Sequence, residues 1–161
     1  MAEKKTAATR VGSGIPGFGE SKGAAARSFT VLKGEFKVEI GEVTATEGKK
    51  HGTFNVRIPT TILGGPEQDD GWDPEGKENS WFINVDPELV NDSGVAFTVD
   101  ALKSVFIAAG VKVQGDEPPY GKLTGKVCAV QAWKSKPDEK GNIYQRFSFV
   151  PLEKSKTFRE D

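Results

Sequence analysis

Cationic and aromatic side chains occur close together at several points of the chain, most densely between residues 133 and 146. Binding a single nucleic-acid strand requires cations that neutralise phosphates and flat side chains on which unstacked bases can lie. The candidate residues for this chemistry are Lys37, Lys49, Lys50, Arg57, Phe82, Lys126, Trp133, Lys134, Lys136, Tyr144 and Arg146. The alternative is an ordinary solvated surface, because alternate charged residues on strands commonly face water.

Other patterns resemble catalytic or cofactor motifs but lack the context that such sites need. Residues 12–17 read G-x-G-x-x-G, but no strand precedes them and Pro16 interrupts them, so the dinucleotide-binding context is absent. His51 is the only histidine and Cys128 the only cysteine, which argues against a catalytic triad, a thiolate metal cage or an internal disulfide. We therefore expect no cofactor, no metal and no catalytic residue.

An acidic stretch at residues 64–79 is the strongest argument for an enzyme. A hydrolase could pair two of its carboxylates, but a loop that contains glycine and proline offers no rigid element to hold such a pair. The spacing also lacks the alternating ligands and the terminal glutamate of an EF-hand. We expect a solvated acidic loop and a protein that is not an enzyme. The acidic residues of this loop are Glu67, Asp69, Asp70, Asp73, Glu75 and Glu78.

Length and composition favour a single folded unit. The chain has 161 residues, of which 28% are charged, and a net charge of -1, and this length suits one domain. Its longest apolar run, at residues 105–113, is too short to span a membrane, and the N-terminal residues lack the apolar core of a signal peptide. We expect a cytoplasmic protein that does not contact membranes.

Residues 1–33 are expected to form a flexible basic arm, with six basic and two acidic residues. The first 28 of them hold few large apolar side chains, too few to compensate for the entropy lost on ordering. From residue 34 the period of the apolar residues changes to two, which is typical of strands. Strands are predicted at residues 36–46, 54–58 and 80–86, with a turn at 48–52 and a bend or sheet edge at Pro59.

A helix and two further strands are predicted in the second half of the chain. The helix is expected to be capped by Thr98 and ended by Gly110, because apolar residues between them recur at three- and four-residue spacing. The apolar positions are Val99, Leu102, Val105, Phe106 and Ala109. Strands at 123–133 and 143–152 would be joined by a polar turn at 134–142, and residues 153–161 would form a short C-terminal tail.

Alternation in the last strand predicts which side chains face outward. Ile143, Phe147 and Phe149 share one parity and are expected in the core. Tyr144 and Arg146 should then point outward together, because successive side chains of a strand alternate between its two faces. An aromatic ring and a guanidinium placed in this way could stack one base and hold one phosphate.

The predicted order, β-β-β-α-β-β, is that of the OB-fold, an all-β, five-stranded Greek-key barrel with one helix. In this fold the face of strands 2 and 3 and the loops between strands 1 and 2 and between strands 4 and 5 bind oligonucleotides or oligosaccharides. The domain would span residues 34–152. Most of the candidate cations and rings lie on those strands and loops.

Three segments carry a resemblance to a known family. They are GEFKVEIGEVTATEGKKHGTFNVRI, FTVDALKSVFIAAGVKV and LTGKVCAVQAWKSKPDEKGNIYQRFSFV. In layout and texture they look like bacteriophage single-stranded DNA-binding proteins of the OB type, over residues 34–152. The long acidic loop and the tail KSKTFRED, which has only two acidic residues, depart from many replication-type DNA-binding proteins.

The resemblance implies a protein that binds and protects single-stranded DNA, largely without sequence specificity, during phage replication or recombination. Replication or recombination proteins would be its partners, and the host cell cytoplasm its location. Two alternatives remain open: a structural or interaction β-domain of a virion, and a sugar-binding barrel. The sequence also leaves open whether the protein forms homo-oligomers.

Overall fold

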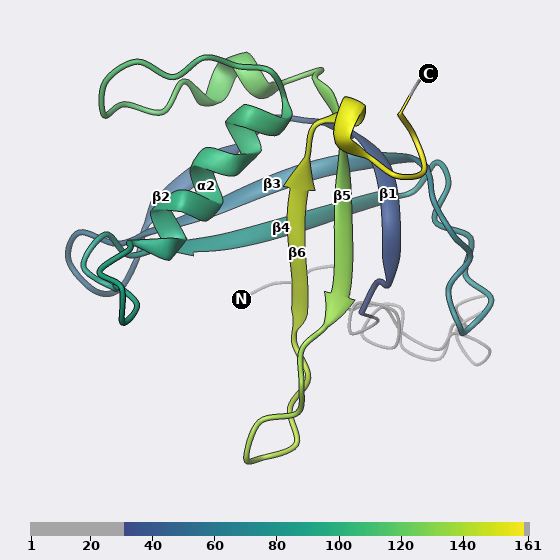
Figure 1. Ribbon diagram of the computed structural model, residues 1–161, viewed down its shortest axis with the longest axis horizontal. Helices are drawn as coiled ribbons and strands as arrows, with labels where there is room; N and C mark the ends of the chain where they lie inside the picture. The colour runs from purple at the N-terminus through teal and green to yellow at the C-terminus, as the bar shows by residue number, and fades with distance from the viewer. Residues whose placement is uncertain (1–30, 160–161) are drawn as a thin grey trace, which may run out of the picture. The chain divides into compact units, whose positions relative to one another are not determined.

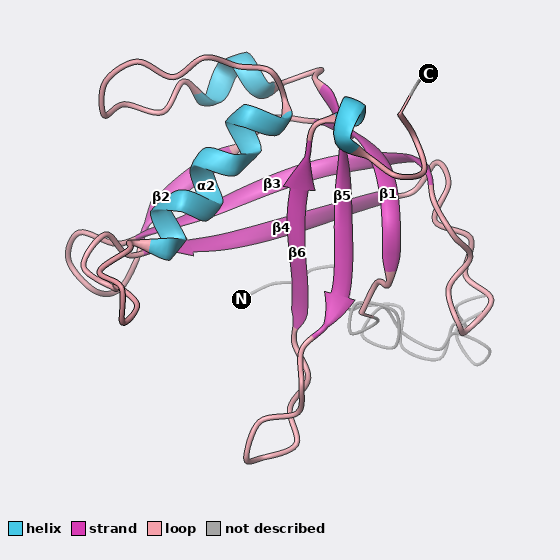
Figure 2. Ribbon diagram, in the orientation of Figure 1, coloured by secondary structure: helices cyan, strands magenta, loops and turns pink. Residues whose placement is uncertain are grey.

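The computed structural model describes residues 31–159 and is mostly β-structure with one α-helix (Figure 1 and Figure 2). The flexible arm predicted for residues 1–33 lies outside these residues except for its last three positions. In chain order the strands and the helix are β1 (Gly34–Ile40), β2 (Thr44–Glu47), β3 (Phe54–Gly64), β4 (Glu78–Val85), α2 (Phe97–Ala108), β5 (Val127–Lys134) and β6 (Gln145–Val150). Short 3₁₀ helices occupy Tyr120–Leu123 and Leu152–Lys154.

All six strands form one antiparallel sheet in the order β2-β3-β1-β5-β6, with β4 paired to β3. The prediction of five strands is wrong because the first predicted strand, 36–46, breaks after Ile40 into β1 and β2. Pro59 of β3 lies opposite this break, between the pairs that β3 makes with β1 and with β2. Proline has no backbone N–H, so it fits at a position where no strand hydrogen bond is needed from it. Pairing runs to Thr60 with Ile40 on one side and resumes at Arg57 with Thr44 on the other.

The last two strands are shorter than predicted. Leu123 is buried in a 3₁₀ helix and β5 begins only at Val127. β6 begins at Gln145 and not at Ile143. The Tyr144 N–H donates to the Ser135 Oγ at 2.8 Å, so a side chain replaces a backbone carbonyl as its acceptor and the regular strand pairing ends before Tyr144. Ile143 is therefore 46% exposed, and its predicted place in the core is wrong.

The helix is present but does not begin as predicted. It starts at Phe97, and its Ala96 N-cap has no side-chain hydrogen bond. Thr98 is not the cap, because its hydroxyl accepts from the N–H of Asp86 at 2.9 Å and donates to the carbonyl of Asp86 at 3.0 Å. Thr98 thus attaches the first turn of α2 to the end of β4. Gly110 follows the helix with a φ of 74°, as predicted for its end.

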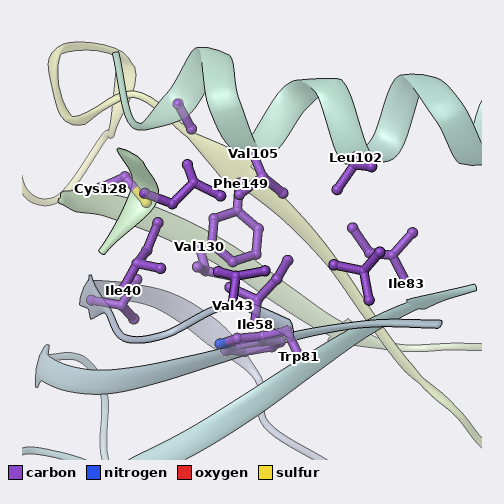
Figure 3. Close-up of a cluster of buried hydrophobic side chains, with 14 of the residues drawn as sticks. Ile40, Val43, Ile58, Trp81, Ile83, Leu102, Val105, Cys128, Val130 and Phe149 are labelled. Carbon is purple, nitrogen blue, oxygen red and sulfur yellow. The ribbon is translucent and has the colours of Figure 1, made fainter. Parts of the chain in front are cut away.

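The buried face of α2 differs in part from the predicted one. It consists of Leu102, Val105, Phe106 and Ala108, whereas Val99 is exposed. Figure 3 shows Leu102 and Val105 pointing from α2 toward Phe149 and the sheet. Cys128 is also fully buried, and burial raises the pKa of its thiol to about 12, which keeps it protonated and unreactive at neutral pH.

Trp81 lies in this core, and its side chain connects β4 to β6. It is 1% exposed, and its Nε1 donates to the Thr60 hydroxyl at 2.9 Å. Its ring lies 5.1 Å from that of Phe147 and 6.3 Å from that of Phe149, measured between centroids. The side chains of β4 and β6 therefore meet, although β4 and β6 do not pair through their backbones in the described part of the chain. We call this unpaired junction the seam; α2 contacts both of its strands.

The two ends of the described chain are held against the sheet. Leu32 is buried, and its N–H and carbonyl both hydrogen-bond the side chain of Gln145. In the predicted tail, Ser155 is fully buried and donates to the Glu35 carboxylate at 2.8 Å, and the Thr157 N–H donates to the same oxygen at 2.9 Å. Residues 31–33 before β1 and residues 151–159 after β6 thus belong to the same folded unit as the sheet.

Glu35 makes the attachment of the C-terminal segment dependent on pH. Partial burial alone would raise its pKa, but hydrogen bonds from Ser155, Gln131 and Thr157 outweigh burial and lower the pKa from 4.5 to about 2. A lowered pKa stabilises the fold above the unfolded-state value of 4.5, and this contribution is lost as the pH falls toward 2.

We therefore expect Glu35→Gln to cost about 1 kcal/mol of unfolding free energy at pH 7, a figure reduced for solvent screening of a partly exposed group. The cost should shrink as the pH falls from 4.5 toward 2. Urea denaturation of both proteins at several pH values measures it. A cost that stays constant down to pH 2 would show that the carboxylate charge is not what holds the segment.

Candidate nucleic-acid interface

Four of the predicted site residues form two cross-strand pairs at outward-facing positions of the sheet. Arg57 of β3 lies directly opposite Phe82 of β4, and Trp133 of β5 lies directly opposite Arg146 of β6. Directly opposite residues of an antiparallel pair have Cβ atoms about 4.5–5.5 Å apart and point to the same face. We call these four residues the outer row: Arg57, Phe82, Arg146 and Trp133.

Strand alternation explains why the outer row faces solvent. In each strand the neighbouring positions supply core side chains, such as Ile58 beside Arg57 and Trp81 beside Phe82. Phe82 is 64% exposed and Trp133 is 47% exposed, values that are high for large rings. Burial of the neighbouring side chains thus makes the outer row face solvent, and the rings of Phe82 and Trp133 are not needed for the core.

A groove along the seam joins the two halves of the row. It has a volume of about 360 Å³, and Phe82 and Asn84 of β4 line it together with Arg146 and Ser148 of β6. Phe97 at the start of α2 also lines it, while Phe147 and Phe149 contribute from the side of the core. Phe82 and Arg146 therefore border one groove at the place where β4 and β6 do not pair.

The groove residues Asn84, Phe97 and Ser148 were not among the predicted candidates. Alternation already placed Asn84 on the same face as Phe82, so the signal for this residue was present in the sequence. Phe97 could not be found, because it precedes the residue predicted to cap the helix. Ser148 becomes relevant only through the seam, which depends on how β6 crosses β4.

Electrostatics favour the Arg146 side of the row. Within residues 31–159, neither Arg57 nor Arg146 has an ion pair. Arg57, however, also borders a second hollow that carries the carboxylates of Glu39, Glu42 and Glu78. These would repel phosphates, so an anionic chain crossing the row would lie over the seam and away from that hollow.

The other predicted cations are spread around this surface. Lys50 is already paired with Asp86 at 3.2 Å, whereas Lys49 has no ion pair in the described part of the chain. Both border a polar hollow together with Asn55 and Asn84, a pair of opposite residues next to Arg57 and Phe82. Lys49 is thus the cation of the 48–52 turn that is available for a phosphate.

Two predicted cations lie away from the end of the row that Trp133 forms. Lys37 pairs with Ala129, about 13 Å from Trp133 along β5 at the usual strand rise. Lys126 precedes β5 at its opposite end, about 23 Å from Trp133 by the same rise. The structure therefore places Lys37 and Lys126 away from Trp133.

The loop between β5 and β6 holds the remaining candidates. Lys134 ends β5 next to Trp133, and Lys136 is exposed in the loop. Tyr144 is exposed too, but its hydroxyl donates to Asp138 Oδ2 at 3.0 Å. The backbone N–H of Asn142 makes the largest contribution to lowering the pKa of Asp138, and the Tyr144 hydroxyl adds to it. Tyr144 is thus engaged in shaping the loop and lies beside the row, not in it.

The acidic loop uses several of its carboxylates to build turns. Asp70 accepts from the N–H of Trp72 and Asp73 from the N–H of Glu75, both at 3.0 Å. Asp69 pairs with Lys33 at 3.2 Å. In residues 31–159 no group of three or more metal-ligating side chains comes together.

The outer row and its groove can stack flat rings and hold anions on one surface. Exposed aromatic side chains contribute about 1–3 kcal/mol per stacked base, and neighbouring cations neutralise the phosphates between the bases. The protein-family models and the curated proteins compared with this chain include no match.

Proposed function

We propose that the protein binds single-stranded DNA across the outer row, without chemically changing it. The observation that carries this proposal is the alternation of cation and aromatic ring across four strands, Arg57, Phe82, Arg146 and Trp133. A single strand presents phosphates and unstacked bases in alternation, so its chemistry matches the row. A duplex keeps its base faces stacked and could not use Phe82 and Trp133.

We also propose that the fold is an OB-type barrel left open at the seam. The support is the strand pairing when β1 and β2 are counted as one bent strand. The pairs β1–β3, β3–β4, β1–β5 and β5–β6, with a helix between β4 and β5, are those of a five-stranded Greek-key barrel. The row then includes the second and third strands, the face that OB-folds use for oligonucleotides.

A protein of this type would protect single strands during phage DNA replication or recombination in the host cytoplasm, and replication or recombination proteins would be its partners. In residues 31–159 no helix has the length and apolar character needed to cross a membrane. Stacking on Phe82 and Trp133 does not depend on base identity, because every base has a flat face. Binding would therefore be largely independent of sequence.

Fluorescence anisotropy with labelled single-stranded and duplex oligonucleotides at several salt concentrations tests the proposal. The single strand should bind more tightly, with a log-log salt slope of about -0.7 for each phosphate neutralised. A sugar-binding barrel would also display exposed rings, but its binding would ignore salt. No binding to single strands, a flat salt response or a preference for the duplex would each contradict the proposed function.

A further inference from the structure

A second groove, which no residue of the outer row lines, is apolar. It has a volume of about 400 Å³ and lies between the end of the β2–β3 ladder, the start of α2 and the segment before the first 3₁₀ helix. Phe54 and Val99 are exposed on its walls. We call it the apolar groove; its apolar lining also includes Val85, Leu102, Pro118 and Tyr120.

The charges around the apolar groove indicate what can enter it. Its only charged lining residues are Glu47 and Asp116, both carboxylates, and neither has an ion pair in the described part of the chain. They would repel the phosphates of a nucleic acid. An apolar side chain flanked by cations would instead pack against the apolar lining and place its cations beside Glu47 and Asp116.

The loop between β5 and β6 has this chemistry. It projects from the sheet on the side away from α2 (Figure 1). Ile143 is 46% exposed near its end, an apolar side chain that the fold does not use. Lys134, Lys136 and Lys140 accompany Ile143, against the two carboxylates Asp138 and Glu139.

The projecting loop is also held in one shape. Asp138 accepts hydrogen bonds from the N–H groups of Lys140 and Asn142 and from the Tyr144 hydroxyl, at 2.8 to 3.0 Å. These bonds occupy the Asp138 carboxylate and leave the lysines exposed. A preorganised loop loses little entropy on docking, which favours its use as a ligand.

We propose that Ile143 of one copy of this protein docks into the apolar groove of a second copy, with the loop lysines near Glu47 and Asp116. The loop lies on the side of the molecule away from α2, so it cannot fill the groove of its own chain. The contact is therefore head-to-tail. Each copy keeps a free groove at one end and a free loop at the other, and such contacts continue into chains unless they close into a ring.

Sedimentation equilibrium of the full-length protein tests this docking without DNA, so its outcome is independent of the proposed DNA binding. The mean mass of the wild type should rise between about 10 µM and 1 mM, the range of a small transient interface. Ile143→Ser removes the apolar anchor and Val99→Arg blocks the groove. Each should weaken self-association about 10-fold or more.

Mixing the two variants gives the sharpest result. The intact loop of Val99→Arg can enter the intact groove of Ile143→Ser, but no further copy can add, so the mixture should form dimers and nothing larger. Ile107→Ser removes an exposed apolar side chain of α2 outside both surfaces and should associate like the wild type. A wild type that stays monomeric, or variants that associate as strongly as wild type, would overturn the proposal.

Discussion

Replacing Arg57 and Arg146 together with glutamine should weaken single-stranded DNA binding by about 100-fold at low salt, or about tenfold for each lost charge-assisted phosphate contact. The log-log salt slope should also become shallower by about 1.4, because two fewer phosphates are neutralised and each contributes about 0.7. The melting temperature should stay nearly constant, since both side chains are exposed and carry no ion pair within residues 31–159. Anisotropy titrations and thermal melts measure the two effects.

The matched control is Lys103→Gln combined with Lys112→Gln. It removes the same net charge from two exposed positions outside the row and the seam groove. DNA affinity should change only slightly, through the long-range field of the protein. If this control weakened binding as much as the arginine pair, binding would depend on total charge and the row would not be the site.

Replacing Trp81 with alanine should cost about 3–5 kcal/mol of unfolding free energy, the usual cost of removing a large buried ring. Trp81 fills the floor of the core and is the ring that β4 presents to Phe147 and Phe149 across the seam. Its loss would also remove the Nε1 donor from the Thr60 hydroxyl. Urea denaturation followed by circular dichroism measures the loss.

Trp133→Ala is the contrasting substitution. Its ring is exposed, so the unfolding free energy should change by no more than about 0.5 kcal/mol, whereas single-strand affinity should fall by about 1–3 kcal/mol. The two tryptophans thus separate stability from binding. The opposite result, a stable Trp81→Ala and an unfolded Trp133→Ala, would mean that the two faces of the sheet have been interchanged.

Much of the sheet could be predicted because strand alternation is a local property. The alternation predicts one face with Arg57 and Phe82 and the opposite face with Val56, Ile58 and Trp81, and the structure exposes the first set and buries the second. Phe54 shares the parity of Val56 and Ile58 but is 42% exposed, so the alternation is wrong at the start of β3. The order of strands and helix also followed from local periods and turns. Which strands pair could not be read in this way, because pairing joins residues far apart in the chain.

The errors arose where a tertiary contact replaced a local rule. Thr98 has the side chain of a helix cap, but it bonds the backbone of Asp86 instead. Ile143 continues the apolar alternation, yet the Ser135 hydroxyl ends the strand before it. Ser155 belonged to a polar segment predicted as a tail, but Glu35 holds it in a buried position. In each case the hydrogen-bonding partner lies nine or more residues away in the sequence, so no local pattern could reveal the contact.

The outer row was predictable in its members but not in its arrangement. Arg57, Phe82, Trp133 and Arg146 were all candidates, together with seven residues that the structure places elsewhere or beside the row. What selects these four is the register, which sets Trp133 opposite Arg146, and the seam, which brings Arg146 to Phe82. Both are consequences of the assembled sheet.

The indole N–H signals in a ¹⁵N-correlated NMR titration with an oligothymidylate test the central claim most directly. The chain has three tryptophans, and Trp133→Phe identifies the signal of the one in the row. The Trp133 signal should shift on saturation with the single strand, while the Trp81 signal, held by Thr60 in the core, should stay in place. If the oligonucleotide binds and the Trp133 signal does not move, the outer row is not where the strand lies.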